Sequence, residues 1–148
     1  MRLPFAAAVA LAAASSLHAQ DLSTATPIAG NWAYAATADG SEAAFANATG
    51  SPQLWVHCTR ATRRVSIAKP ATGAAPLLNV WTSSLTRSAP ASFNPATGRL
   101  TIDLAAADPL LDAIVSSRGR IGLTVAGQPS LVVPAWAEAA RVIEDCRA

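Results

Sequence analysis

The chain contains two cysteines, and their positions constrain the fold more than any other feature. Cys58 ends the run QLWVHC, and Cys146 ends the stretch LVVPAWAEAARVIEDC near the C-terminus. In an exported protein two cysteines most simply form a disulfide, because the oxidising compartment keeps paired thiols closed. A Cys58–Cys146 bridge closes a loop that spans more than half of the chain. The sequence therefore predicts a domain whose C-terminal segment is fastened to its first half.

The N-terminus has the pattern of a secretory signal peptide. Met1-Arg2 gives a charged start, Leu3 to Leu17 an alanine-rich apolar run, and Leu17-His18-Ala19 an exit with a small final residue. We expect cleavage after Ala19. The alternative is an N-terminal membrane anchor, but the run is shorter than the roughly 20 apolar residues of a spanning helix. Together with the abundance of alanine and of arginine over lysine, the pattern indicates a bacterial protein that is periplasmic or secreted.

The remaining chain is long enough for one domain and too short for two of ordinary size. We expect a signal peptide over 1–19, a flexible lead-in over 20–30 and a single β-rich domain over 31–148. The 11 Lys and Arg residues nearly balance the 9 Asp and Glu residues, so no charged field favours nucleic acid as a partner. No further apolar run is long enough for a transmembrane segment.

Alternation of apolar and polar residues predicts about eight antiparallel strands. The clearest is 99–104, where Leu100, Ile102 and Leu104 share one face. The pair Asp39-Gly40 marks a hairpin between the first two strands. The other segments with strand character are 31–38, 43–48, 53–59, 64–69, 77–83, 120–126 and 131–133.

Two segments have helical spacing instead. Asp108-Pro109 supplies an N-cap carboxylate and a proline at the first helical position, so we expect a short helix from Pro109 to Ser117. From Ala135 onward an apolar stripe that includes Trp136 and Cys146 predicts a C-terminal helix with both residues facing inward. The predicted fold is mainly β, a single small antiparallel sandwich or barrel with a helix before the last hairpin and another at the end.

His57 is the first candidate for chemistry, since it is the one histidine outside the signal peptide and it adjoins Cys58. Neighbouring strand residues point to opposite faces, so the two side chains cannot act together as base and nucleophile. One histidine and two distant cysteines also lack the ligand spacing of a zinc site. These features argue against a thiol enzyme and against a bound metal.

Other enzyme classes lack their signatures as well. The serine pairs 83–84 and 116–117 have no elbow-like setting for a serine hydrolase. The carboxylates Asp103, Asp108 and Asp112 could form a glycosidase pair, but strand and helix positions account for them. No glycine loop for phosphate is present. The sequence predicts no catalytic residue and no cofactor.

A partner-binding surface is the remaining hypothesis. Trp55, His57 and Trp81 lie on the less aliphatic faces of their strands, and exposed aromatic patches mark interfaces. Arg60, Arg63 and Arg64 form a basic cluster at a predicted hairpin tip. The alternatives are that helices cover the aromatic residues and that the arginines form a solvated turn.

The opening strand with Trp32 and Tyr34, the WVHC strand and the ending DPLLDAI…SRGRIGLTV…LVVPAW…RVIEDCR resemble those of small exported proteins of alphaproteobacteria. A more distant resemblance is to the invasion-associated locus B family, from whose cysteine pattern this chain departs. That resemblance implies a periplasmic β-sandwich-like domain, and no catalytic residue carries over. Our first hypothesis is a non-enzymatic domain that binds another envelope or extracellular component. The alternatives are a hydrolase that uses His57 with a nearby carboxylate, and a purely structural envelope protein.

Overall fold

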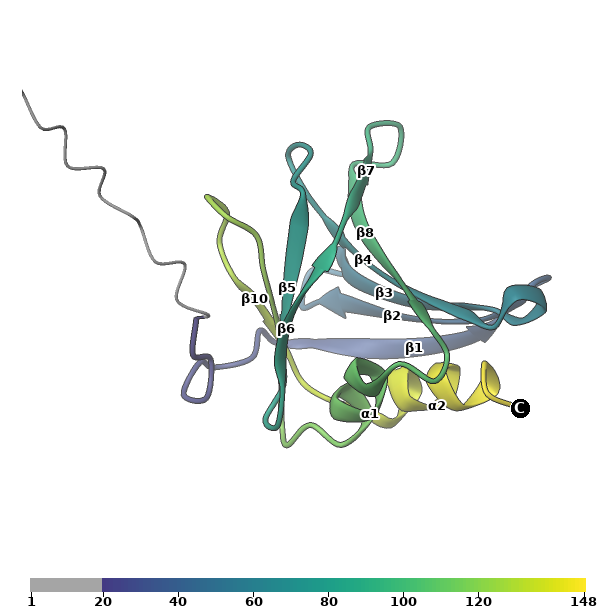
Figure 1. The fold of residues 1–148 in the computed structure, drawn as a ribbon. Coiled ribbons are helices and arrows are strands. Elements are labelled where there is room, and N and C mark those ends of the chain that lie inside the picture. Colours follow the sequence, from purple (N-terminus) through teal and green to yellow (C-terminus); the bar gives the residue numbers. More distant parts are fainter. Residues whose placement is uncertain (1–19) are drawn as a thin grey trace, which may run out of the picture.

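The computed structural model describes residues 20–148 as two antiparallel β-sheets and two helices (Figure 1). The expected signal peptide lies outside the described residues. The six-stranded sheet has the order β1 (Gly30–Ala36), β2 (Gly40–Asn47), β3 (Pro52–Thr59), β4 (Arg64–Pro70), β8 (Arg99–Ala105) and β7 (Ser92–Asn94). The four-stranded sheet has the order β10 (Leu131–Val133), β9 (Ile121–Thr124), β5 (Leu77–Trp81) and β6 (Thr86–Pro90).

The predicted fold class is confirmed: the protein is mainly β, and its two sheets form a sandwich-like architecture rather than one closed barrel. The strands beyond the expected set are β6 and β7, which form from a segment whose alternation is weak. They are joined directly through Ala91, so the chain passes there from the edge of one sheet to the edge of the other. This crossing creates the cleft described below.

The two helices cover the part of the six-stranded sheet that the smaller sheet leaves free. Helix α2 (Ala137–Asp145) contacts β1, β2 and β3, and α1 (Pro109–Val115) packs against α2 (Figure 1). Helix α1 ends two residues earlier than expected, while Asp108 caps it as predicted through a hydrogen bond from the Leu110 N–H. Its largest side chains, Leu110, Leu111 and Ile114, are buried.

The predicted disulfide is present and joins α2 to the six-stranded sheet. Cys58 lies on the inner face of β3 and Cys146 directly after α2, with their Cα atoms 5.5 Å apart. A second tie lies beside the bridge, because the Tyr34 hydroxyl donates to an Asp145 carboxylate oxygen over 2.7 Å. Trp136 differs from the expectation: it precedes the helix and is 62% exposed. It occupies the N-cap position, with an extended backbone, and therefore does not join the buried stripe.

The segment expected to be a flexible lead-in is instead packed against the second sheet. Leu22 is 3% exposed, and a Cβ at Gly122 would lie only 2.2 Å from its Cδ1 atom. The Ile28 N–H donates to the Val132 carbonyl over 2.9 Å. The absence of a side chain at Gly122 makes room for this segment, and small polar composition alone does not reveal such a contact.

Candidate functional site

The outer face of the six-stranded sheet holds three of the six predicted partner-binding residues, Trp55, His57 and Arg64. The core side chains of β3 alternate inward, which leaves Trp55 and His57 half-buried on the outer face. Strand pairing sets His57 between Glu42 of β2 and Ser66 of β4, and Ser66 in turn opposite Asp103 of β8. One polar row therefore crosses four strands.

His57 lies between two carboxylates. Its Nε2 is 3.1 Å from Asp39 Oδ2, and its Nδ1 is 3.5 Å from Glu42 Oε2. The first contact has hydrogen-bond geometry, whereas Nδ1 makes no hydrogen bond despite its proximity to Glu42. Hydrogen bonds from the Thr37 hydroxyl and from His57 hold the pKa of Asp39 below its usual value. No hydroxyl or thiol group in the described part of the chain forms a hydrogen bond with His57. The cluster therefore contains no assembled nucleophile–base pair.

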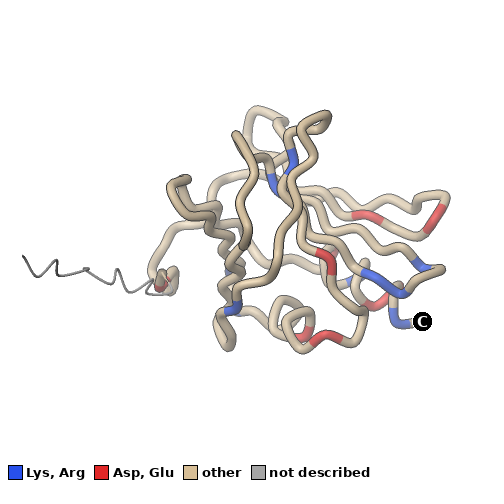
Figure 2. The backbone as a smooth tube through the Cα atoms, turned by 45° about the horizontal axis from the view of Figure 1, so that its top comes forward, with Lys and Arg blue, Asp and Glu red and all other residues tan. Residues whose placement is uncertain are grey.

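The three arginines of the predicted basic cluster have different surroundings. Arg64 extends across the outer face to Asp103, with 2.7 Å between Nε and Oδ2. Arg63 has a left-handed backbone (φ 51°), and its guanidinium donates to the Arg147 carbonyl. Arg60 is exposed in a short 3-10 turn and forms no ion pair with any described residue. Figure 2 shows backbone positions of acidic residues close to those of the basic residues at this end of the molecule.

The two tryptophans of the predicted surface do not meet. The Arg99 guanidinium carbon lies 3.6 Å from the centroid of the Trp55 ring, a cation–π contact on the outer face of the six-stranded sheet. Trp81 belongs to β5 in the other sheet, where it lies beside Gly122. The structure thus brings together Trp55, His57 and Arg64 and places Trp81 elsewhere.

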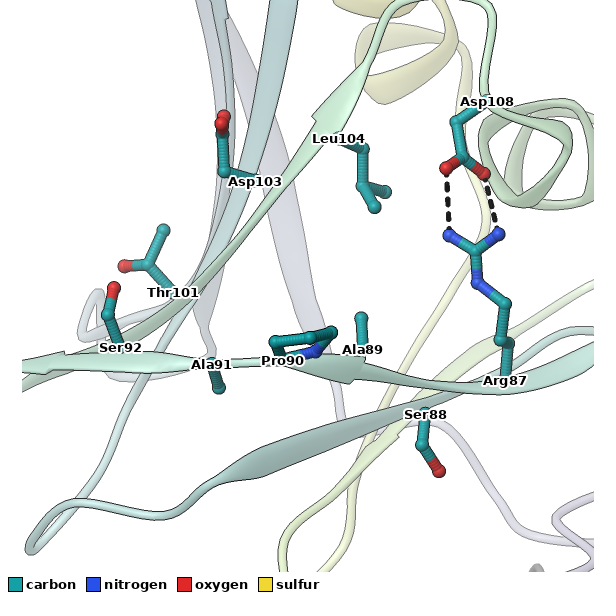
Figure 3. Close-up of a pocket in the computed structure, with 10 residues that line it drawn as sticks. All are labelled: Arg87, Ser88, Ala89, Pro90, Ala91, Ser92, Thr101, Asp103, Leu104 and Asp108. Atoms are coloured by element: carbon teal, nitrogen blue, oxygen red, sulfur yellow. Dashed lines mark hydrogen bonds and ion pairs between the residues drawn. The ribbon is translucent and has the colours of Figure 1, made fainter.

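A cleft of about 560 Å³ adjoins this face where the two sheets separate (Figure 3). Its walls are β6, β7, the second half of β8 and the start of α1. Thr101 and Asp103 of β8 belong both to the cleft and to the outer face. The Arg87 guanidinium spans the cleft to the Asp108 carboxylate through two contacts of 2.9 Å. The remaining lining residues are Ser88, Ala89, Pro90, Ala91, Ser92 and Leu104.

Unpaired strand edges face this cleft. In an antiparallel pair of strands, every second residue directs its backbone N–H and carbonyl toward the neighbouring strand. The Thr82–Leu85 and Ala91–Pro76 hydrogen bonds show that the odd-numbered residues of β6 are the ones that bond to β5. The backbone groups of Thr86, Ser88 and Pro90 therefore point away from β5.

The edge of β8 is more fully satisfied than the edge of β6. Beyond β7, the carbonyl of Asp103 accepts from the Arg64 guanidinium, and the carbonyl of Ala105 accepts from the Asp108 N–H. The free edge of β6 has no corresponding hydrogen bonds from described residues. Pro90 removes one N–H donor from this edge, as is common in edge strands. Ser88 is the residue of β6 that offers both an N–H and a carbonyl in the middle of the cleft.

We expect Asp108 to contribute to the stability of the folded protein in a pH-dependent way. Burial raises its pKa, but hydrogen bonds from Arg87 and from the Leu110 N–H outweigh that effect and hold the pKa below its usual value. Because the folded-state pKa is lowered, the stabilisation is present above the unfolded-state value of about 3.9 and is lost as the pH falls through the folded-state value.

The substitution Asp108→Asn isolates the charge, because asparagine caps a helix as well as aspartate does. At pH 7 it should lower the free energy of unfolding by up to about 1 kcal/mol. Urea denaturation between pH 7 and pH 2.5 checks this. The difference from wild type should shrink in the acid range, and a constant difference would contradict the role of the charge.

Among residues 20–148, no three His, Cys, Asp or Glu side chains lie close enough together to hold a metal ion. No helix in the same part of the chain has the length and apolar character needed to cross a membrane.

Comparison with known proteins yields no relative. The chain matches no protein-family model, no curated protein and no solved structure. The geometry of the cleft and of the outer face beside it is therefore what bears on the function.

Proposed function

We propose that this protein is a non-enzymatic, exported β-domain that binds a protein of the bacterial envelope or the extracellular space by accepting an extended segment in the cleft beside β6. The cleft with its free strand edge carries the proposal. An added strand pairs with β6 through main-chain hydrogen bonds, and side-chain contacts supply specificity. The disulfide and the expected signal peptide support an oxidising location.

The outer face would supply the specificity. A segment that leaves the cleft past Asp103 reaches the Arg64–Asp103 pair and then Trp55 with its stacked Arg99. Tryptophan and arginine are common among the residues that dominate binding energy at interfaces. Arg64 and Asp103 already pair with each other, and Arg99 lies against Trp55, so we expect the partner to be held by main-chain pairing and aromatic contact more than by net charge.

The substitution Ser88→Pro tests the proposal. It removes an outward N–H and places a ring at the free edge, while the hydrogen bonds from Arg87 and Ala89 to β5 stay intact. Affinity capture from periplasm and culture medium should recover a reproducible partner with wild type, and about 10-fold less of it with Ser88→Pro.

Ser88→Ala is the matched control. Both substitutions remove the hydroxyl that donates to Asn79, but alanine keeps the backbone N–H. Ser88→Ala should therefore retain the partner. Equal recovery with both variants, at equal thermal midpoints, would contradict strand addition at β6.

A hydrolase is the second candidate, because one observation favours it: the Asp39 carboxylate is hydrogen-bonded to His57 as an orienting acid would be to a general base. The reaction would require a water or substrate hydroxyl as nucleophile. Turnover on a panel of esters and glycosides that disappears in His57→Ala, but persists in Trp55→Ala, would favour this candidate over the binding domain. We expect no turnover with the wild-type protein.

A further inference from the structure

Lys69, the single lysine of the chain, faces the interior of the protein. It lies at the end of β4, opposite the buried Leu100, and shares the inner face with Val65 and Ile67. Only 6% of the residue is exposed. Removing an ammonium group from water is costly unless a counter-charge or several hydrogen bonds replace the water.

The protein supplies little of that compensation. The Nζ atom donates to the Pro70 carbonyl over 2.7 Å, which uses one of its three N–H donors. No carboxylate of the described residues lies within 4 Å of it. Burial lowers the pKa of the Lys69 amine, in keeping with this lack of a partner.

A groove of about 370 Å³ opens beside Lys69. Ile28, Pro129 and Leu131 give it apolar walls, and Asn47 adds an amide. The Asn47 Oδ1 atom already accepts the backbone N–H groups of its own turn. These bonds leave its side-chain NH₂ group unused, and Asn47 lines the same groove as Lys69.

We propose that this groove binds a small amphipathic carboxylate, whose carboxylate pairs with the Lys69 ammonium and whose apolar tail lies against Ile28 and Leu131. The size falls within the range of small-molecule sites, which are mostly apolar with a few placed polar groups. An anion is favoured over a neutral ligand because it supplies the counter-charge that the protein omits. The site is separate from the cleft at β6 and does not depend on the proposed function.

Octanoate and 1-octanol are suitable probes, since they share a tail and differ in charge. Calorimetric titration should give saturable binding of octanoate to wild type, weakened about 10-fold or more in Lys69→Met. Octanol should bind both proteins equally and more weakly. Lys69→Arg keeps the charge and should retain most of the octanoate affinity. Methionine removes a buried charge but little volume, so Lys69→Met should remain folded.

NMR of the ¹⁵N-labelled wild type gives a test that needs no variant. Octanoate should shift the amide signals of Asn47, Lys69 and Ser130 and leave those of the β7–β8 turn unchanged. Equal octanoate affinity in wild type and Lys69→Met would overturn the proposal. So would shifts elsewhere, or no saturable binding at millimolar octanoate.

Discussion

Replacing both cysteines with alanine should lower the free energy of unfolding by about 4 to 5 kcal/mol. The bridge joins residues 88 positions apart, and its loss releases a long loop in the unfolded chain. A change of that size is a large share of the stability of a small domain. Urea denaturation of the Cys58→Ala/Cys146→Ala protein and of wild type, both monitored by tryptophan fluorescence, measures it.

Reduced wild-type protein is the control for this experiment. Treated with a thiol reductant, it should unfold at the same urea concentration as the double variant, because both lack the same covalent link. Unfolded protein that has not been reduced should expose no free thiol, since neither cysteine of residues 20–148 is free. An unchanged denaturation midpoint in the double variant would contradict the stabilising role of the bridge.

The substitution Phe45→Ala should lower the free energy of unfolding by about 3 to 5 kcal/mol. Phe45 is fully buried on the inner face of β2, where its ring and the ring of Trp32 pack edge to face with 5.6 Å between the centroids. Removal of the ring loses its transfer free energy and leaves a cavity that the packed sheet cannot close. Urea denaturation again gives the value.

Trp55→Ala is the matched control, because Trp55 is the larger side chain but lies on the outer face of the neighbouring strand. It should cost about 1 kcal/mol, the value of its cation–π contact with Arg99. Equal losses in Phe45→Ala and Trp55→Ala would mean that the two faces of the sheet are equally buried, against the fold described above.

The regular strands and helices can be predicted from the sequence, because the alternation of apolar and polar residues indicates directly which face of a strand is buried. The strand 99–104, the hairpin at Asp39-Gly40 and the helix capped by Asp108 are all present. The pairing of Cys58 with Cys146 also follows from the sequence, since no other pair exists. The inward position predicted for Trp136 is wrong, because helical spacing does not show where a helix begins.

The candidate site is harder to predict, because it depends on how the two sheets meet. Ser84 to Phe93 has weak alternation, so neither β6 nor the cleft beside it is visible in the sequence. Trp81, like Trp55, lies on the less aliphatic face of a strand with alternating residues. The strand order nevertheless places Trp81 in the other sheet. The inward direction of Lys69 could have been read from the spacing of Val65 and Ile67, but a lysine at a strand end is ordinarily exposed.

Hydrogen exchange at the Ser88 amide, with and without the captured protein, tests the central claim most directly. In the free protein this N–H points away from β5 and should exchange rapidly. Strand addition at β6 predicts marked slowing for Ser88 in the complex, while amides on the outer edge of β1 stay unchanged. Rapid exchange at Ser88 in a saturated complex, with protection at another surface, would contradict binding in the cleft.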